Sequence, residues 1–544
     1  MNFLSVFGLL ALLGIAYAMS YHRSDVKLKP IFWGIGLQFL FAVIILIQDY
    51  RSFIGMGILG LLIIVYLLQK DDKKFGGGVK STVVVAACCC ILGVGLYYIS
   101  AVIPWLLTAT LVFTFLNSWM KWKQEIQRYA GALLIVICVV FLISEGWQGH
   151  FIFQAFSDKV AAFLNLSDYG SKFLFGNLAN NNFFGPWEQK FPNLGTWPGF
   201  GFQFAFKVLP TIIFFGGFMS VLYYLGIMQK LIDAMSKFMR WTIGTSGAET
   251  LSCSANIFVG QTEAPLLIKP FIDGMTKSEL LTVMVGGFAT IAGGVLAGYI
   301  AMGVPAGHLV AASVMSAPAA LVIGKLIYPE REHSQTAGDV GLPDINVGSN
   351  AIEAAANGIT DGMKLAVNVG AMLIGFIALI AVLDVLLNWM DMLIDGKLLA
   401  GEYVKYSAVG MSPAVGEFTG FFPGSLQTFF GTALRPLAFL MGVSWDNAQY
   451  VGNLLGIKLS LNEFVAYGTL GSYIKDGVLS ERAIVISTYA LCGFANFSSI
   501  GIQIGGISAL APHRKSDLAK VGLKAMFGGA LASFLTATIA GLLM

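Results

Sequence analysis

Charged side chains are scarce in this sequence, and their scarcity excludes most soluble classes of protein. Only 12% of the 544 residues are Asp, Glu, Lys or Arg, whereas 56% are apolar. A soluble domain usually carries about twice that charged fraction. The net charge of +3 is scattered over short loops, so nothing in the sequence indicates a surface that binds nucleic acid.

Metal-binding and catalytic side chains are also few. The six cysteines lie inside apolar segments without metal-ligand spacing, and we interpret them as buried small apolar residues. One tetrapeptide, Gly244-Thr245-Ser246-Gly247, matches the G-x-S-G pattern of an intramembrane serine protease. A protease needs a base near that serine, and all five histidines fall at predicted loops or helix ends. We therefore predict that the protein is not an enzyme, with the protease as a remote alternative.

Apolar runs are what the sequence has in excess. Runs of roughly 17 to 25 residues, long enough to cross about 30 Å of hydrocarbon, recur along the whole chain. Examples are Phe3–Met19, Ile31–Ile47, Ser81–Ile99, Phe204–Ile227 and Leu365–Leu387. They lack period-two alternation, and in lipid only helices or closed barrels satisfy the backbone. The sequence therefore predicts an all-α polytopic membrane protein, whose first segment is a retained helix because it lacks a basic leader and a cleavage site.

Lysine and arginine orient the helices, because short cytoplasmic loops collect positive charge. The loop after the first helix and the run His513-Arg514-Lys515 are both basic. We therefore place both on the inside face of the cell inner (plasma) membrane and expect both termini outside. Four helices are predicted between Arg51 and Trp147. The polar, aromatic segment from Gln148 to about Pro198 is expected at the outer surface.

The two halves of the chain share a repeat. Asn256-Ile-Phe-Val259 is followed 31 residues later by Gly287-Phe-Ala-Thr290. Asn462-Glu-Phe-Val465 is followed at the same spacing by Gly493-Phe-Ala-Asn496, so both pairs match at one offset of 206 residues. An internal repeat is characteristic of secondary transporters.

Around each Asn-x-Phe-Val lies a segment too polar and too broken to span a membrane. We interpret Glu249–Pro270 and about Asn447–Ile474 as two re-entrant helical hairpins that enter from opposite faces, as an inverted repeat. The chain then divides into six parts: N-terminal helices with an insertion at about 49–147 (1–147), an interfacial segment and scaffold helix (148–240), the first hairpin and following helices (241–327), a cytoplasmic linker (328–363), a scaffold helix and interfacial region (364–445), and the second hairpin and following helices (446–544).

The hairpin tips carry the candidate chemistry. A carboxylate at membrane depth is costly unless it faces water or a partner, so Glu263 and Glu463 are functional candidates; the alternative is a structural carboxylate that binds free N–H groups. Gln261-Thr262-Glu263 suits a neutral ligand that makes several hydrogen bonds. Lys458 is expected to pair with a carboxylate such as Glu463, and Phe494 to stack on a flat ring or to pack. Four neutral side chains are either ligands or contacts between helices, namely Asn256, Thr290, Asn496 and Ser499.

At these positions the sequence resembles the concentrative nucleoside transporters. The resemblance is carried by the two hairpin motifs, Asn256–Pro265 and Asn462–Tyr467, and by the segments after them, Gly287–Gly294 and Ala490–Ser499. The run Val314–Ala320 is similar as well. The insertion at about 49–147 departs from shorter bacterial members, and we expect it to serve packing because its helices carry no ionisable group near their centres.

The resemblance implies a homotrimer in lipid, in which each protomer has a scaffold and a transport domain that moves as an elevator. It implies a symporter that imports purine and pyrimidine nucleosides with a cation, Na+ first and H+ as the alternative. In the implied site, Gln261, Thr262 and Glu263 face the nucleobase, Phe494 lines the base pocket, and Glu463, Asn496 and Ser499 hold the ribose. The implied sodium ligands are Asn256, Val259, Thr290 and Ile291.

An ion channel is a further alternative on the residues alone. The polar groups predicted near the midplane form an asymmetric set, which is unlike the ring of identical groups that lines a pore. The pattern therefore favours a carrier.

Overall fold

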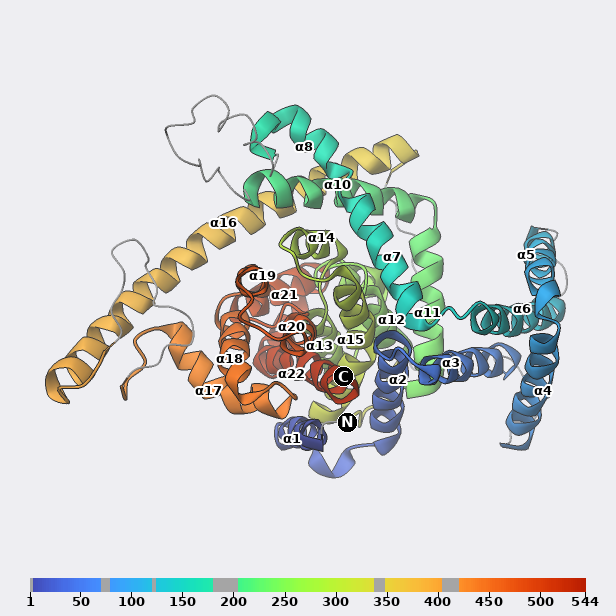
Figure 1. Ribbon diagram of the computed structural model, residues 1–544, viewed down its shortest axis with the longest axis horizontal. Helices are drawn as coiled ribbons and strands as arrows, with labels where there is room; N and C mark the ends of the chain where they lie inside the picture. Colours follow the sequence, from blue (N-terminus) through green and yellow to red (C-terminus); the bar gives the residue numbers. More distant parts are fainter. Residues whose placement is uncertain (1–2, 70–78, 120–123, 180–203, 337–347, 404–419) are drawn as a thin grey trace. The chain divides into compact units, whose positions relative to one another are not determined.

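The computed structural model describes residues 3–69, 79–119, 124–179, 204–336, 348–403 and 420–544, and every regular element in these ranges is a helix (Figure 1). Six of the described helices are long and apolar enough to cross a membrane. The chain separates into two compact units, residues 36–156 and residues 1–35 with 157–542. The prediction of an all-α polytopic membrane fold is confirmed.

The smaller unit contains the four helices expected between Arg51 and Trp147. They are α3 (Tyr50–Gln69), α4 (Val79–Tyr98), α5 (Ile103–Trp119) and α6 (Gln124–Ser144). A small apolar cluster around Ile64, Ile103 and Ile137 packs them together. Many other apolar side chains, such as Ile91 and Trp105, are exposed, as expected for helices that face lipid. The unit also takes in most of α2 (Leu28–Leu46) and the start of α7 (Gly149–Leu164).

The larger unit has an outer pair of helices that pack through glycine. Helix α10 (Phe204–Tyr224) lies beside α16 (Ala351–Asp391), the longest helix at 41 residues (Figure 1). A Cβ added to Gly216 would lie 2.7 Å from the carbonyl oxygen of Gly358, so only glycine allows this approach. Because α16 begins at Ala351, residues 351–363 are helical, and the predicted linker 328–363 ends too late. The remaining outer elements are α1 (Phe3–Ala18), α8 (Ser167–Phe175) and α11 (Ile227–Ile243).

The core of this unit consists of two series of elements in the same order. The first comprises α12 (Gly247–Ala255), the 3-10 helix η4 (Ala264–Gly274), α13 (Lys277–Ala289), α14 (Gly293–Ala301) and α15 (Ala306–Ile327). The second, which follows α17 (Leu426–Leu440), comprises α18 (Trp445–Ser460), α19 (Glu463–Asp476), α20 (Glu481–Leu491), α21 (Phe497–Leu510) and α22 (Lys515–Leu543). Each series is a hairpin, two short helices separated by a break, and a long apolar helix. The order agrees with the repeat of 206 residues.

The two breaks lie against each other. We call residues 290–292 the first break and residues 492–496 the second break. Gly493, in the second, has a φ of 122°, which favours glycine. A Cβ there would lie 2.7 Å from the carbonyl carbon of Ala289, at the end of α13. Backbone groups freed from helical hydrogen bonding are thus gathered in the centre of the repeat.

Candidate binding site between the two hairpins

Gln261 links the tip of the first hairpin to α21. The tip, residues 256–263, joins α12 to η4, and the Gln261 side chain is only 8% exposed. Its amide nitrogen donates to the Ser499 hydroxyl at 3.3 Å, and its amide oxygen accepts from Gln503 Nε2 at 3.0 Å. The donor and the acceptor of one amide are therefore both aimed at the same helix.

Glu463 is the corresponding group on the second hairpin. It is the first residue of α19, and its side chain is 4% exposed. One carboxylate oxygen accepts from the Tyr299 hydroxyl at 3.2 Å, and the other accepts from Asn496 Nδ2 at 3.2 Å. Tyr299 itself is stacked on Tyr467 with a ring-centroid distance of 4.3 Å. The carboxylate is thus fixed by side chains from both series.

A continuous line of hydrogen-bonded polar groups joins the Glu463 carboxylate to the Gln261 amide. Asn496 Oδ1 accepts from the backbone N–H of Ser499 at 2.9 Å, because Asn496 is the N-cap of α21. The line therefore runs from Glu463 through Asn496 and Ser499 to Gln261. Of the predicted substrate residues, these four are brought together.

The other predicted substrate residues lie beside this line. Thr262 is half-buried against α21, where a Cβ added to Gly506 would lie 3.2 Å from Thr262 Cγ2. Phe494 is half-buried in the second break. Glu263 is exposed, and its carboxylate lies over Gly260, in the space that a side chain at position 260 would fill. Glu263 therefore differs from Glu463 in burial.

The predicted sodium ligands lie where the first tip meets the first break. Asn256 and Thr290 are each 1% exposed, Ile291 is fully buried, and Val259 is half-buried. Both polar side chains adjoin Gly286: Thr290 Oγ1 donates to its carbonyl at 2.8 Å, and Asn256 Nδ2 lies 3.4 Å from where a Cβ would be. The N–H of Gly293 donates to the carbonyl of Phe258 at 3.1 Å, which ties the tip to the break.

Asn256 is unusual because its polar atoms are buried without partners. Among the described residues, neither its Oδ1 nor its Nδ2 has a hydrogen-bond partner, and a buried amide left in this way is costly. The described residues also contain no group of three or more His, Cys, Asp or Glu side chains placed to hold a metal. The neutral oxygens here suit a hard cation of low charge rather than a transition metal.

Two site residues escaped the sequence interpretation. Tyr299 is the hydroxyl donor to Glu463, and Gln503 fixes the amide of Gln261. Gln503 is the only amide side chain of helix α21 (Phe497–Leu510), whose other polar side chains are serines, and a buried amide at membrane depth is a signal of function. Lys458, which was expected to pair with Glu463, instead donates to backbone carbonyls of the second break.

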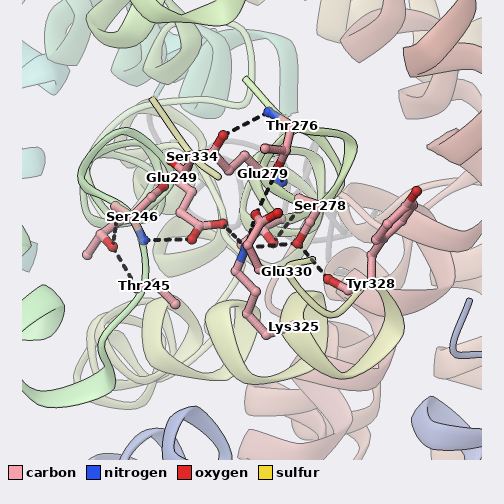
Figure 2. Close-up of polar contacts among 12 residues, drawn as sticks. Thr245, Ser246, Glu249, Thr276, Ser278, Glu279, Lys325, Tyr328, Glu330 and Ser334 are labelled. Carbon is pink, nitrogen blue, oxygen red and sulfur yellow. Dashed lines mark hydrogen bonds and ion pairs between the residues drawn. The ribbon is translucent and has the colours of Figure 1, made fainter. Parts of the chain in front are cut away.

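The foot of the first hairpin is held by a separate polar cluster (Figure 2). Lys325 Nζ contacts Glu249 Oε2 at 2.7 Å, Ser278 Oγ at 2.9 Å and Glu330 Oε2 at 3.3 Å. Glu249 also accepts from the backbone N–H of Ser246 at 2.8 Å, because Ser246 is the N-cap of α12. The serine of the G-x-S-G tetrapeptide therefore begins a helix, and the cluster attaches that helix to α15.

Comparison with known proteins places the chain in a family. Residues 308–541 match the family model "Na+ dependent nucleoside transporter C-terminus", residues 205–306 match "Nucleoside recognition", and residues 7–50 match "Na+ dependent nucleoside transporter N-terminus". An uncharacterized transporter of Haemophilus influenzae is 43% identical over 423 residues, which cover 77% of this chain and 91% of that protein. Sodium/nucleoside cotransporter 1 of Mus musculus is 41% identical over 409 residues, covering 73% and 56%.

A solved structure is similar over almost the whole chain. The transporter CNTnw, in an inward-facing substrate-bound state, is 31% identical, covers 99% of this chain and 97% of its own, and has a TM-score of 0.69. Fold and comparisons together define a multi-pass membrane transporter, not an enzyme. The chain belongs to the concentrative nucleoside transporter family, as the hairpin motifs predicted, and is a nucleoside transporter. The protease alternative is thereby excluded.

Proposed function

We propose that this nucleoside transporter is a symporter that imports purine and pyrimidine nucleosides with Na+, by an elevator-type movement, as a homotrimer in the cell inner membrane. Relatives named sodium/nucleoside cotransporters support the coupling ion. The observation that carries the proposal is the buried polar line between the hairpins. Its Gln261 belongs to the same tip as Asn256, whose amide has no hydrogen-bond partner among the described residues.

The proposed substrate site assigns the ribose to the second hairpin. A carboxylate can accept hydrogen bonds from both hydroxyls of a vicinal diol, and Glu463 has two oxygens held by neutral donors that a substrate hydroxyl can join or replace. Asn496 and Ser499 complete the bonding to the sugar. Gln261 presents a donor and an acceptor to the base, while Thr262, Glu263 and Phe494 line the base pocket.

The proposed ion site couples sodium to this pocket through the first tip. A sodium ion held by Asn256, Val259, Thr290 and Ile291 would fix the tip backbone only two residues before Gln261. Because Gln261 then needs no further ordering, the nucleoside binds more tightly, and the reciprocal effect on sodium follows from linkage. Both hairpins are joined by the polar line, so the site is expected to move as one body.

Uptake into proteoliposomes tests the proposal. Radiolabelled uridine uptake should require an inward sodium gradient and should fall to the level of empty vesicles when choline replaces sodium at fixed pH. Uptake that persists in choline and follows a pH gradient would show that protons, and not sodium, are the coupling ion. Counterflow exchange of labelled uridine, without any gradient, should persist when sodium is present on both sides.

A further inference from the structure

Lys458 is a buried cation that the proposed transport cycle does not yet use. It lies near the end of α18, and its side chain has no exposed surface. Its ammonium donates to the carbonyl oxygens of Ala490 at 2.8 Å and Cys492 at 3.3 Å. These carbonyls belong to the last residues of α20 and the start of the second break. The ammonium therefore lies at the C-terminal end of a broken helix, where the backbone dipole is negative.

The surroundings of Lys458 are those of a bound cation rather than of an ion pair. Among the described residues, the hydrogen bonds of the ammonium go to backbone carbonyls and not to a carboxylate, and the Phe534 ring has its centroid 5.6 Å from Nζ. Ser533 Oγ also donates to the Cys492 carbonyl. A lysine so deeply buried is costly and is retained here by carbonyl oxygens, which are also ligands of hard cations.

The first repeat lacks such a cation at the matching place. The offset of 206 residues pairs Lys458 with Ser252, a fully buried residue whose hydroxyl has no hydrogen-bond partner among the described residues. It pairs Ala490 and Cys492 with Met284 and Gly286. Those two carbonyls accept from neutral donors, Gln503 Nε2 at 3.2 Å and Thr290 Oγ1 at 2.8 Å.

We propose that the Lys458 ammonium is a tethered cation that holds the second break in its binding geometry, so that only the first break takes a cation from solution. This inference rests on the proposed sodium site at the first break. Lys458 is a positioning residue: it does not touch the polar line, but it fixes the end of α20, from which Phe494, Asn496 and Ser499 follow. Its charge also lies on the side of the site that carries Glu463.

Two neutral variants separate charge from packing. Lys458→Met keeps the length without charge or donor, and Lys458→Gln keeps a donor without charge. With purified protein at saturating sodium, both should raise the Kd for uridine about tenfold or more. Ser533→Ala removes the other donor to the Cys492 carbonyl and should stay within about twofold of the wild type. A wild-type Kd in Lys458→Met, or in Lys458→Gln alone, would overturn the tethered-cation role.

A third variant tests the position directly. Lys458→Ala leaves space for a small cation, and methylammonium should restore part of its uridine affinity while it has no effect on Lys458→Met. Absence of any rescue would mean that Lys458 acts only through packing.

The wild type gives a reading that does not depend on how variants fold. Its uridine binding should depend on sodium with a Hill coefficient near one, and a coefficient near two would show a second cation from solution and overturn the inference. Wild-type binding without any sodium dependence would instead contradict the sodium site itself, so the two failures are distinguishable.

Discussion

The two hairpins share an order of elements but differ in how their polar groups are satisfied. The second arm of the first hairpin is a 3-10 helix of 11 residues, Ala264–Gly274, with prolines at 265 and 270. The second arm of the second hairpin is an ordinary α-helix, Glu463–Asp476. Long 3-10 helices are uncommon because their hydrogen bonds are poorer. The backbone hydrogen bonds in the second arm of the first hairpin are therefore less regular than those in the second arm of the second hairpin.

The asparagines that head the repeated motif show the same contrast. Asn256 follows the first arm directly, and its amide is buried without a partner among the described residues. Asn462 is the N-cap of α19 and accepts from the backbone N–H of Val465 at 2.9 Å. The second repeat thus has a helix cap at Asn462 and a lysine at 458. At the matching positions the first repeat has, at Asn256, an amide without a partner among the described residues, and Ser252. This difference supports our proposal that the first hairpin binds a free cation and that the second does not need one.

The largest expected effect is at the second hairpin. Glu463→Gln should reduce uridine uptake about 100-fold or more, because charge-assisted hydrogen bonds to the ribose hydroxyls are lost. Glu481→Gln is the matched control, since Glu481 is an exposed carboxylate in the first turn of α20, and it should transport normally. Both variants should melt within a few degrees of the wild type. Full transport by Glu463→Gln would contradict the proposed contact between the ribose and the carboxylate.

The foot of the first hairpin should be the next most sensitive place. In the Lys325–Glu249 pair the side chains are 10% and 1% exposed, so Lys325→Met leaves a buried carboxylate unpaired and should cost about 3 kcal/mol of stability. Adding Glu249→Gln should recover part of the loss. Asn453→Ala, which removes a neutral bond to Tyr473 in the second hairpin, should cost only about 1 kcal/mol. Thermal unfolding in detergent measures the stability of the wild type, the two single variants and the double variant. Equal losses of stability in Lys325→Met and Asn453→Ala would contradict the expected difference between the two hairpins.

Substrate analogues can assign each end of the nucleoside to a hairpin. Deoxyuridine lacking one ribose hydroxyl should bind about tenfold more weakly than uridine. That penalty should disappear in Glu463→Ala but persist in Gln261→Ala, because only the former removes the partner of the missing hydroxyl. Competition against labelled uridine gives the six affinities, those of two ligands for the wild type and the two variants. The reverse pattern would place the ribose on the first hairpin.

The smallest effects compare the two asparagines. Asn256→Ala should raise the half-saturating sodium concentration about tenfold, with little change in uridine affinity at saturating sodium. Asn462→Ala loses a helix cap, so it should cost about 1 kcal/mol of stability and leave the sodium response unchanged. Sodium titrations of uridine uptake, paired with thermal unfolding, distinguish the two. A similar sodium shift in both variants would mean that the repeats share one cation role.

The helices could be predicted from the sequence because long apolar runs mark them, and the repeat could be predicted because two motifs recur at one spacing. The four helices of the insertion and both hairpins lie close to their expected bounds. The partners of the site side chains could not be predicted, since Tyr299 and Gln503 reach Glu463 and Gln261 only through contacts between distant segments. The backbone partners of Lys458 could not be predicted for the same reason. The early start of α16 was missed because its first turns, Ala351–Met363, are polar and rich in small residues that also occur in linkers.

A structure with bound uridine, determined in sodium, tests the shared site most directly. Density for the ribose should lie within hydrogen-bonding distance of the Glu463 carboxylate and of Asn496, with the base next to Gln261 and an ion beside Asn256. Uridine bound to one hairpin alone, with Gln261 and Glu463 too far apart for one nucleoside to bridge them, would contradict a site formed by both repeats.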